Sequence, residues 1–226
     1  ILRETADPEI TLDAGDENTL IRLSTGRYEL PNSPPDEFPD VPTFDPGSRY
    51  HELTAGVLRT LIKRTAFAAE KKESTRWAVT GVLWEAEGEK ARLVATDTKR
   101  LAWTEGPATV FGDADAKPQS HLIPLKAINL LERNLTDDGE LVRVALKANE
   151  ALFQTERALI HTKLVEGRFP PYKDIVPKSQ KVKLAVSCPD LLARVRQAAI
   201  MTDDESKRVD FTFEAGKATL RARGPE

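Results

Sequence analysis

The chain contains a faint internal repeat with an offset of roughly 130 residues, and this repeat constrains its fold more than any other feature. A Phe-Pro step at Phe38-Pro39 returns at Phe169-Pro170, each time after a strand-like segment. After each step we expect an extended run, an amphipathic helix, a charged loop and a hairpin. The first copy has a helix with Leu58, Ile62, Ala66 and Phe67 and a hairpin ending at 92–95; the second has an extended run at Leu184–Val186, a helix with Leu191, Val195, Ala199 and Ile200, and a hairpin ending at 219–222. A repeat this long predicts a duplicated domain rather than a solenoid.

Length and composition favour a folded protein of more than one domain. The 226 residues exceed the usual single-domain size of about 100 to 150. A hydrophobic content of 40% with 31% charged residues excludes a disordered chain. No apolar run approaches the roughly 20 residues that span a bilayer, and the first residues lack the layout of a signal peptide. The single cysteine, Cys188, cannot form an internal disulfide and is more often a packing residue than a nucleophile. We therefore expect a cytoplasmic protein with no membrane partner.

The charge distribution is more informative than the net charge. A net charge of −3 and a pI near 5.8 argue against a protein that coats nucleic acid by bulk attraction. All three expected helices nevertheless have a basic outer face, since residues three or four apart share one side of a helix. These faces carry Arg59 and Lys63, then Lys126, Asn129 and Arg133, then Arg194. Ordinary solvated faces and a functional surface explain this pattern equally well; the functional arrangement places the helices on a positive inner wall and the sheets on an acidic outside.

Two proline clusters, at 31–46 and 170–177, divide the chain into 1–48, 49–176 and 177–226. Only the middle segment reads as a complete unit, with the order strand, helix, strands, helix, strands. This order predicts an α+β fold in which each repeated domain packs two helices on antiparallel sheets.

Local signals set the expected ends of the elements. The first helix should start near Thr54 and the second at Pro124, which suits a first turn. For the third helix, Ser187 is the expected N-cap, with Asp190 completing a variant of the capping box. Hairpins are predicted over 77–96 and 142–154, and a last strand over 159–165.

Catalytic and cofactor motifs are not found in the sequence. Its histidines, His51, His121 and His161, lack metal-ligand spacing, and no Gly-rich phosphate loop or nucleophile elbow is present. Asp97, after a strand, is the best candidate carboxylate, although such residues more often cap a turn. We expect no metal, no cofactor and no catalytic residues; a hydrolase with a diffuse carboxylate site at Asp97 is a distant alternative.

Two longer motifs resemble the bacterial DNA polymerase III beta subunit family, the sliding clamps. They are Val94-Ala95-Thr96-Asp97 followed by Lys99-Arg100-Leu101-Ala102, and Lys163-Leu164-Val165-Glu166-Gly167-Arg168-Phe169-Pro170 with Tyr172. Supporting matches are Phe38-Pro39, Gly81-Val82-Leu83 and Ile123-Pro124, in order along essentially the whole chain.

The resemblance implies a clamp fold in a chain cut at both ends. Residues 1–48 would be the end of the first clamp domain, 49–176 the complete second domain and 177–226 the start of the third. It also implies, when the protein is full length, a head-to-tail homodimer that forms a ring around duplex DNA, with helices inside and sheets outside. Such a protein is a non-catalytic processivity factor. The DNA-facing residues carried over by the motifs are Arg59, Lys63, Lys71, Lys72, Arg76, Trp77, Lys126, Arg133 and Arg194.

The resemblance further implies a pocket that binds DNA polymerases, clamp loader subunits and repair factors through short linear motifs with apolar anchors. Its carried-over residues are Val79, Thr96, Thr98, Lys99, Arg100, Leu101, Pro170 and Ile175, which plain interdomain packing would also explain. This chain departs from the family at Thr98-Lys99, usually Gly-His, at Pro171, usually Asp, and at Asp174, often basic. The alternative function is a divergent clamp-like peptide-binding scaffold that no longer loads on DNA.

Overall fold

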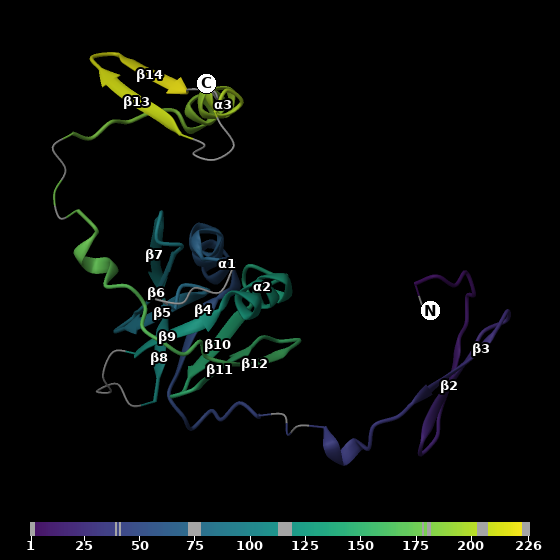
Figure 1. Cartoon of the computed structure of the whole chain (residues 1–226). Coiled ribbons are helices and arrows are strands. Elements are labelled where there is room, and N and C mark those ends of the chain that lie inside the picture. Colours follow the sequence, from purple (N-terminus) through teal and green to yellow (C-terminus); the bar gives the residue numbers. More distant parts are fainter. Residues whose placement is uncertain are drawn as a thin grey trace. The chain divides into compact units, whose positions relative to one another are not determined.

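The computed structural model describes residues 3–38, 40, 42–71, 78–112, 119–177, 179, 182–202 and 208–222. The chain forms two compact units, Ile1–Pro170 and Pro171–Glu226 (Figure 1). Every pair of strands found in the described residues is antiparallel. This confirms the predicted α+β class.

The first unit begins with a three-stranded antiparallel sheet in the order β1-β2-β3. The strands are β1 (Thr11–Ala14), β2 (Asn18–Arg22) and β3 (Arg27–Pro31), and the short 3₁₀ turn η1 (Pro35–Glu37) follows. Ile21 is the buried side chain of β2.

A five-stranded sheet follows, in the order β12-β11-β10-β4-β8. Its strands are β4 (Tyr50–Thr54), β8 (Thr109–Phe111), β10 (Leu141–Leu146), β11 (Glu150–Gln154) and β12 (Leu159–Lys163). Side chains alternate along each strand, because successive residues of a strand point to opposite faces. On β10, Val142, Val144 and Leu146 enter the main core, while Arg143 lies on the other face and pairs with Glu52 of β4.

A four-stranded sheet has the order β7-β6-β5-β9. Its strands are β5 (Gly81–Glu87), β6 (Lys90–Thr96), β7 (Leu101–Pro107) and β9 (Gln119–Pro124). The β5–β6 hairpin turns at Gly88, whose φ of +55° suits glycine. Val82, Trp84 and Leu93 face the core, and the opposite face carries charged side chains such as Arg92.

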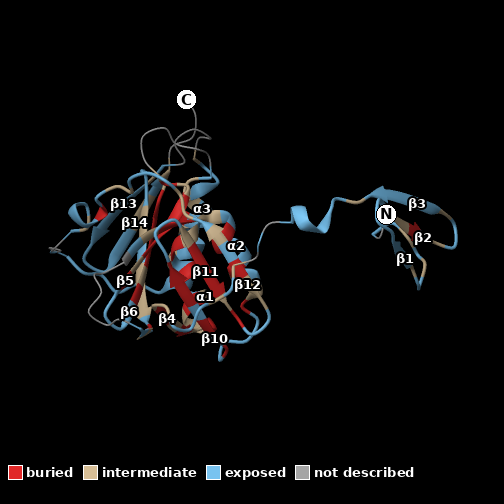
Figure 2. Cartoon of the chain, turned by 90° about the horizontal axis from the view of Figure 1, so that it is seen from below, coloured by how far each residue is buried: buried red, intermediate tan, exposed pale blue. Residues whose placement is uncertain are grey.

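Two helices supply the rest of this core. Helix α1 (Ala55–Thr65) begins where expected, since the Thr54 hydroxyl accepts a hydrogen bond from the Val57 N–H, and α2 (Leu125–Asn134) follows Pro124. Leu58 and Ile62 of α1 and Ile128 and Leu131 of α2 join one cluster with the inward face of both sheets. Burial is therefore concentrated around α1, β10 and β11 (Figure 2). Two helices packed on antiparallel sheets are the arrangement predicted for residues 49–176.

Strands β7, β8 and β9 were not predicted from the sequence. The segment Leu101–Pro107 ends in Gly106-Pro107, a pair typical of a loop. The structure gives Gly106 another role: a Cβ placed there would lie 2.8 Å from Cγ1 of Val57. Glycine therefore allows α1 to approach β7, an edge strand that the helix covers.

Helix α1 also ends earlier than its apolar stripe suggests. The 3₁₀ turn η2 (Ala66–Ala68) follows Thr65 and directs Ala68 inward, and Phe67 is 57% exposed. Phe67, expected within this helix, lies in η2 instead. Its exposure does not depend on the change of helix type, because it follows the buried Leu58 by nine residues and would also point away from the core in a continued α-helix.

The second unit contains η3 (Tyr172–Asp174), α3 (Cys188–Ala199) and the hairpin β13 (Val209–Glu214) to β14 (Lys217–Ala222). A helix followed by a hairpin repeats the order of α1, β5 and β6, as predicted. Leu184–Val186, expected as an extended run, pairs with no strand; β13 and β14 are the only strands in the described part of this unit, and they pair with each other. Ser187 is the N-cap but makes no side-chain capping bond, so the predicted capping box is wrong.

No helix in the described ranges is long and apolar enough to cross a membrane. Helix α3 buries none of its residues in this structure.

Candidate nucleic-acid and peptide interface

Basic side chains line a groove beside α2. Lys126 and Arg133 are exposed on the helix, and Lys71 approaches from the segment after η2. The groove has a volume of about 540 Å³ and is lined by Glu70, Lys71, Thr80, Pro124, Leu125, Lys126, Asn129, Leu130, Arg133 and Val165. The groove carries a net positive charge, because three of its lining side chains are cations and one is a carboxylate. The structure therefore brings together three of the predicted DNA-facing residues.

Helix α1 presents only part of its predicted basic face. Lys63 is exposed, but Arg59 pairs with Asp138 and donates a second hydrogen bond to the Leu135 carbonyl oxygen at 2.6 Å. Arg59 is thus a link between α1 and the loop after α2. Its positive charge is largely neutralised by this partner.

The remaining predicted DNA-facing residues lie elsewhere. Arg194 is exposed on α3 in the second unit, where its guanidinium donates to Oε1 of Gln197 at 3.0 Å. Lys72, Arg76 and Trp77 lie outside the residues that the structure describes.

The turn between β6 and β7 holds most of the predicted peptide-binding residues. Its organiser is Asp97, whose carboxylate accepts hydrogen bonds from the N–H groups of Lys99 and Arg100 and from Nε of Arg100, each at 3.0 Å. Partial burial raises the pKa of Asp97, but these donors and the positive charge of Arg100 outweigh it and keep the pKa below its ordinary value. Asp97 is therefore a turn cap, and this role leaves no hydrolytic function to assign to it.

The side chains of this turn differ in accessibility. Thr96 is buried, where its hydroxyl donates to the Arg100 carbonyl oxygen at 2.6 Å and accepts from the Thr98 N–H at 3.0 Å. Val79, in the segment before β5, is also buried. Leu101 is half-buried, and Lys99 and Arg100 are exposed. A partner can therefore reach Leu101, Lys99 and Arg100, whereas Val79 and Thr96 are inaccessible.

One residue of the turn has a strained backbone. Thr98 has a φ of +74°, and it is the one residue other than glycine with positive φ in the described ranges. A β-branched residue is disfavoured in this left-handed region because its Cβ crowds the following carbonyl oxygen.

Replacing Thr98 with Gly is expected to raise the free energy of unfolding by about 1 kcal/mol, since relief of the left-handed strain exceeds the entropy that glycine adds to the unfolded chain. Urea denaturation checks this. Lys99→Gly, at the next position with ordinary φ, is the matched control and should lower stability. Equal effects of both substitutions would contradict strain at Thr98.

Phe67 was missed as a candidate site residue. Its ring lies beside the turn, with the guanidinium carbon of Arg100 at 5.7 Å from the ring centre. Its spacing of nine residues from the buried Leu58 places it on the outer face of the helix, and this signal could have found it. Of the other predicted residues, Pro170 ends the first unit, and Ile175 belongs to the second unit, where it is 67% exposed.

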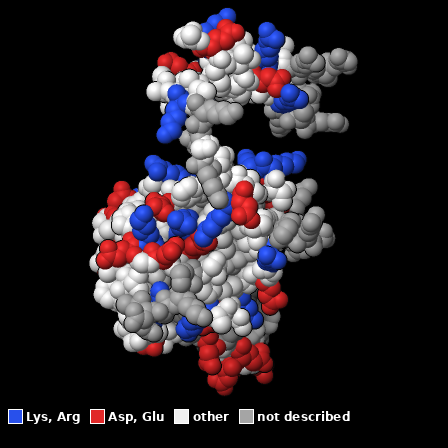
Figure 3. All heavy atoms as spheres, turned by 90° about the vertical axis from the view of Figure 1, so that its left-hand side faces the viewer, with Lys and Arg blue, Asp and Glu red and all other residues white. Residues whose placement is uncertain are grey.

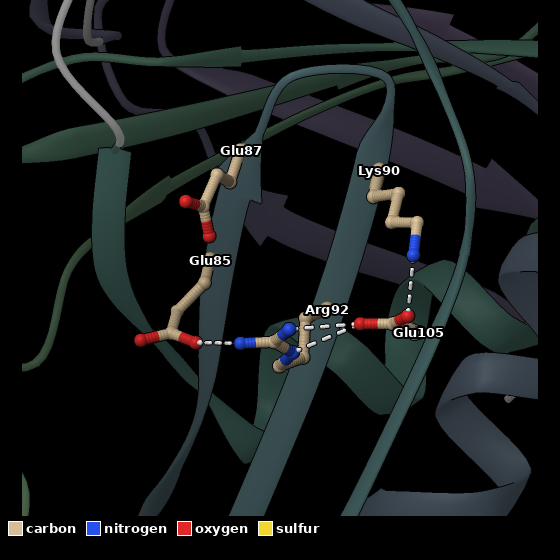
Figure 4. Close-up of a pocket in the computed structure, with 5 residues that line it drawn as sticks. All are labelled: Glu85, Glu87, Lys90, Arg92 and Glu105. Atoms are coloured by element: carbon tan, nitrogen blue, oxygen red, sulfur yellow. Dashed lines mark hydrogen bonds and ion pairs between the residues drawn. The ribbon is translucent and has the colours of Figure 1, made fainter. Parts of the chain in front are cut away.

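The face of the β5–β6–β7 sheet that points away from the helices carries a row of ion pairs (Figure 4). Arg92 bridges Glu85 at 3.3 Å and Glu105 at 2.8 Å, and Glu105 also accepts from Lys90 at 2.7 Å. The hydrogen bonds from Lys90 and Arg92 lower the pKa of Glu105. These pairs line a shallow pocket of about 230 Å³ together with Glu87, and they link side chains of three neighbouring strands.

Charges of both signs are also interspersed over the face shown in Figure 3. No group of His, Cys, Asp and Glu side chains in the described ranges could hold a metal ion.

The family model for the DNA polymerase III beta subunit, central domain, matches residues 52–171. This chain belongs to the DNA polymerase III beta subunit family. It is 30% identical to the beta sliding clamp of Chlamydia pneumoniae over 96% of this chain and 57% of the relative, and 28% identical to that of Escherichia coli K12 over 96% and 58%.

Solved structures of the beta subunit agree with this family. The crystal structure of the DNA polymerase III subunit beta from Pseudomonas aeruginosa superimposes with a TM-score of 0.83 at 26% identity, covering 96% of this chain and 58% of that one. The clamp fold is thereby confirmed. The chain spans somewhat more than half the length of the beta subunits it matches, so the roles of individual residues are proposed below.

Proposed function

We propose that this chain is part of a cytoplasmic sliding clamp that encircles duplex DNA and tethers the replicative polymerase, clamp loader subunits and repair factors, with no catalytic step of its own. The observation that carries the proposal is the set of exposed cations on α1 and α2, namely Lys63, Lys126 and Arg133, together with Lys71 in the adjacent groove. These lie on the helix layer, while the ion-paired rows lie on the opposite face of the sheet.

The modest number of these cations fits a sliding function. A protein that is linked topologically to DNA needs only weak phosphate contacts, whereas many strong contacts would hold it in place. A slightly acidic protein can therefore act on DNA, provided that its cations face the duplex.

The proposal assigns clamp domains to the chain. Residues 1–48 are the end of the first domain, 49–176 the second and 177–226 the start of the third, in a head-to-tail homodimeric ring when the protein is full length. The turn 96–101 with Val79 and Pro170 is the part of the first unit that receives partner motifs, and Ile175 is the residue of the second unit that the family resemblance assigns to the same role. A clamp-like scaffold that binds peptides without loading on DNA is the second candidate, favoured by the loss of Arg59 to its pair with Asp138.

The combined substitutions Lys63→Glu, Lys126→Glu and Arg133→Glu should lower retention on circular plasmid DNA at least about tenfold, because each removes a phosphate contact and adds repulsion. The protein should stay folded, since exposed substitutions typically cost less than about 0.5 kcal/mol each. Retention is measured by gel filtration of the protein–plasmid complex after loading. The protein tested is the full-length product of the gene that encodes this chain.

The matched control replaces Arg157, Lys163 and Lys217 with Glu. These residues are exposed in strands and turns rather than on the helices. It changes the net charge equally and should leave retention intact. Linearising the plasmid should release the parent protein. Equal retention on linear and circular DNA would contradict encirclement, and a protein that never loads would favour the scaffold.

A further inference from the structure

Phe67 and Arg100, although far apart in the sequence, form one composite surface beside the β6–β7 turn. The structure places the guanidinium of Arg100 over the exposed ring of Phe67. Nε of Arg100 also donates to Oδ2 of Asp97 at 3.0 Å. Held from two sides, Arg100 has a defined orientation before any partner arrives, which lowers the entropy lost on binding.

The charge around this surface is positive. Lys63 and Arg64 are exposed on the last turn of α1, just before η2, and Lys99 is exposed next to Arg100. The nearby carboxylates are already engaged: Asp97 accepts the three hydrogen bonds of the turn, and Glu70 accepts from the Lys71 N–H at 2.7 Å. An exposed aromatic ring with a fixed cation is therefore surrounded by further cations.

This combination of groups selects one ligand chemistry. The ring offers apolar contact, and the guanidinium offers charge-assisted hydrogen bonds to a carboxylate. We propose that Phe67 and Arg100 form a second contact region of the docking site, which binds an acidic residue next to the apolar anchor of a partner peptide and so sets the preference among partners. The inference rests on the proposed docking function and extends it to the η2 turn.

An NMR titration of the isotope-labelled chain tests this, since it detects weak binding. The probe is a synthetic peptide of the C-terminal residues of the replicative polymerase from the same organism, made with either Asp or Asn beside its apolar anchor. The Asp peptide should bind about fivefold tighter at low salt, the size of one exposed charge contact. Arg100→Gln should abolish this difference.

Phe67→Ala should weaken both peptides about fivefold, and Phe67→Leu should weaken them less, because leucine retains apolar contact but not the aromatic face. Phe38→Ala, at a ring that is 74% exposed elsewhere, is the control and should change nothing. Equal affinity of the parent and Phe67→Ala, or of the Asp and Asn peptides, overturns the inference.

Failure of the underlying docking function gives a different result. If Leu101→Ala weakens binding while Phe67→Ala does not, the docking site stands and the second contact region is wrong. If the parent chain shows no shifts in the turn 96–101, both are overturned.

Discussion

Acidification from pH 7 to about pH 4.5 is expected to lower the free energy of unfolding by about 2.5 kcal/mol through His51 alone. His51 lies on β4 opposite Val144 and Val110, is fully buried, and has no hydrogen-bond partner for either ring nitrogen among the described residues. Burial, aided by the positive charge of Arg49, lowers its pKa from 6.5 to about 4. The unfolded chain therefore binds the proton more tightly. The stabilisation is complete above about pH 6.5 and is lost as the pH falls towards the folded-state pKa.

Urea denaturation at both pH values measures this loss, and His51→Leu should remove most of it. The carboxylates of Asp97, Glu105 and Glu150, whose pKa values are lowered, contribute an acid loss in both proteins, as does the partly buried His121, so the difference between the variants isolates His51. His161→Leu, at an exposed histidine that pairs with Glu150, is the control: it should retain the loss due to His51 and change only the smaller contribution of Glu150, whose pKa the bonds to Lys147 and His161 lower. A parent and a His51→Leu variant with the same pH dependence would show that His51 is not buried in its neutral form.

Replacing Leu101 with Ala should weaken binding of the polymerase C-terminal peptide about thirtyfold. Truncation of a central apolar anchor site commonly costs about 2 kcal/mol or more, and each 1.4 kcal/mol is a factor of ten. Leu101 is the half-buried apolar side chain of the turn, paired across the strands with the buried Thr96, and so offers the partner an accessible apolar contact. Isothermal titration measures the two affinities.

Lys99→Ala is the matched control, since it truncates a neighbouring exposed side chain at the rim and should change affinity far less. Circular dichroism verifies that both variants are folded. Equal losses for both, or full affinity with Leu101→Ala, would move the docking site away from this turn.

Local sequence signals were sufficient for much of this fold. Thr54 marks the start of α1, and the alternation in 142–154 predicts the β10–β11 hairpin, because capping and strand periodicity act over a few residues. Strand β7 was not predictable in the same way, since Gly106 is needed for the approach of α1 across the sheet. Leu184–Val186 reads as a strand but lacks a pairing partner in the described unit, and pairing decides whether a strand forms.

For the candidate site, too, local sequence signals predicted some features and missed those that depend on contacts between distant residues. The motif from Thr96 to Leu101 located the turn, but the pairing of Arg59 with Asp138 and the position of Arg100 over the Phe67 ring depend on contacts between residues far apart in the sequence. The spacing of residues along a helix shows which side chains lie on the same face of that helix. It does not show which of them already have a partner.

The ion pair between Arg59 and Asp138 affects how easily the proposed clamp would move along DNA. A protein that translocates on a polyanion must break and remake its ionic contacts at every step, so each available cation adds to the friction of movement. By neutralising one cation of α1 internally, the chain retains the link between α1 and the loop after α2 while reducing the drag that this helix would exert on DNA in the proposed clamp.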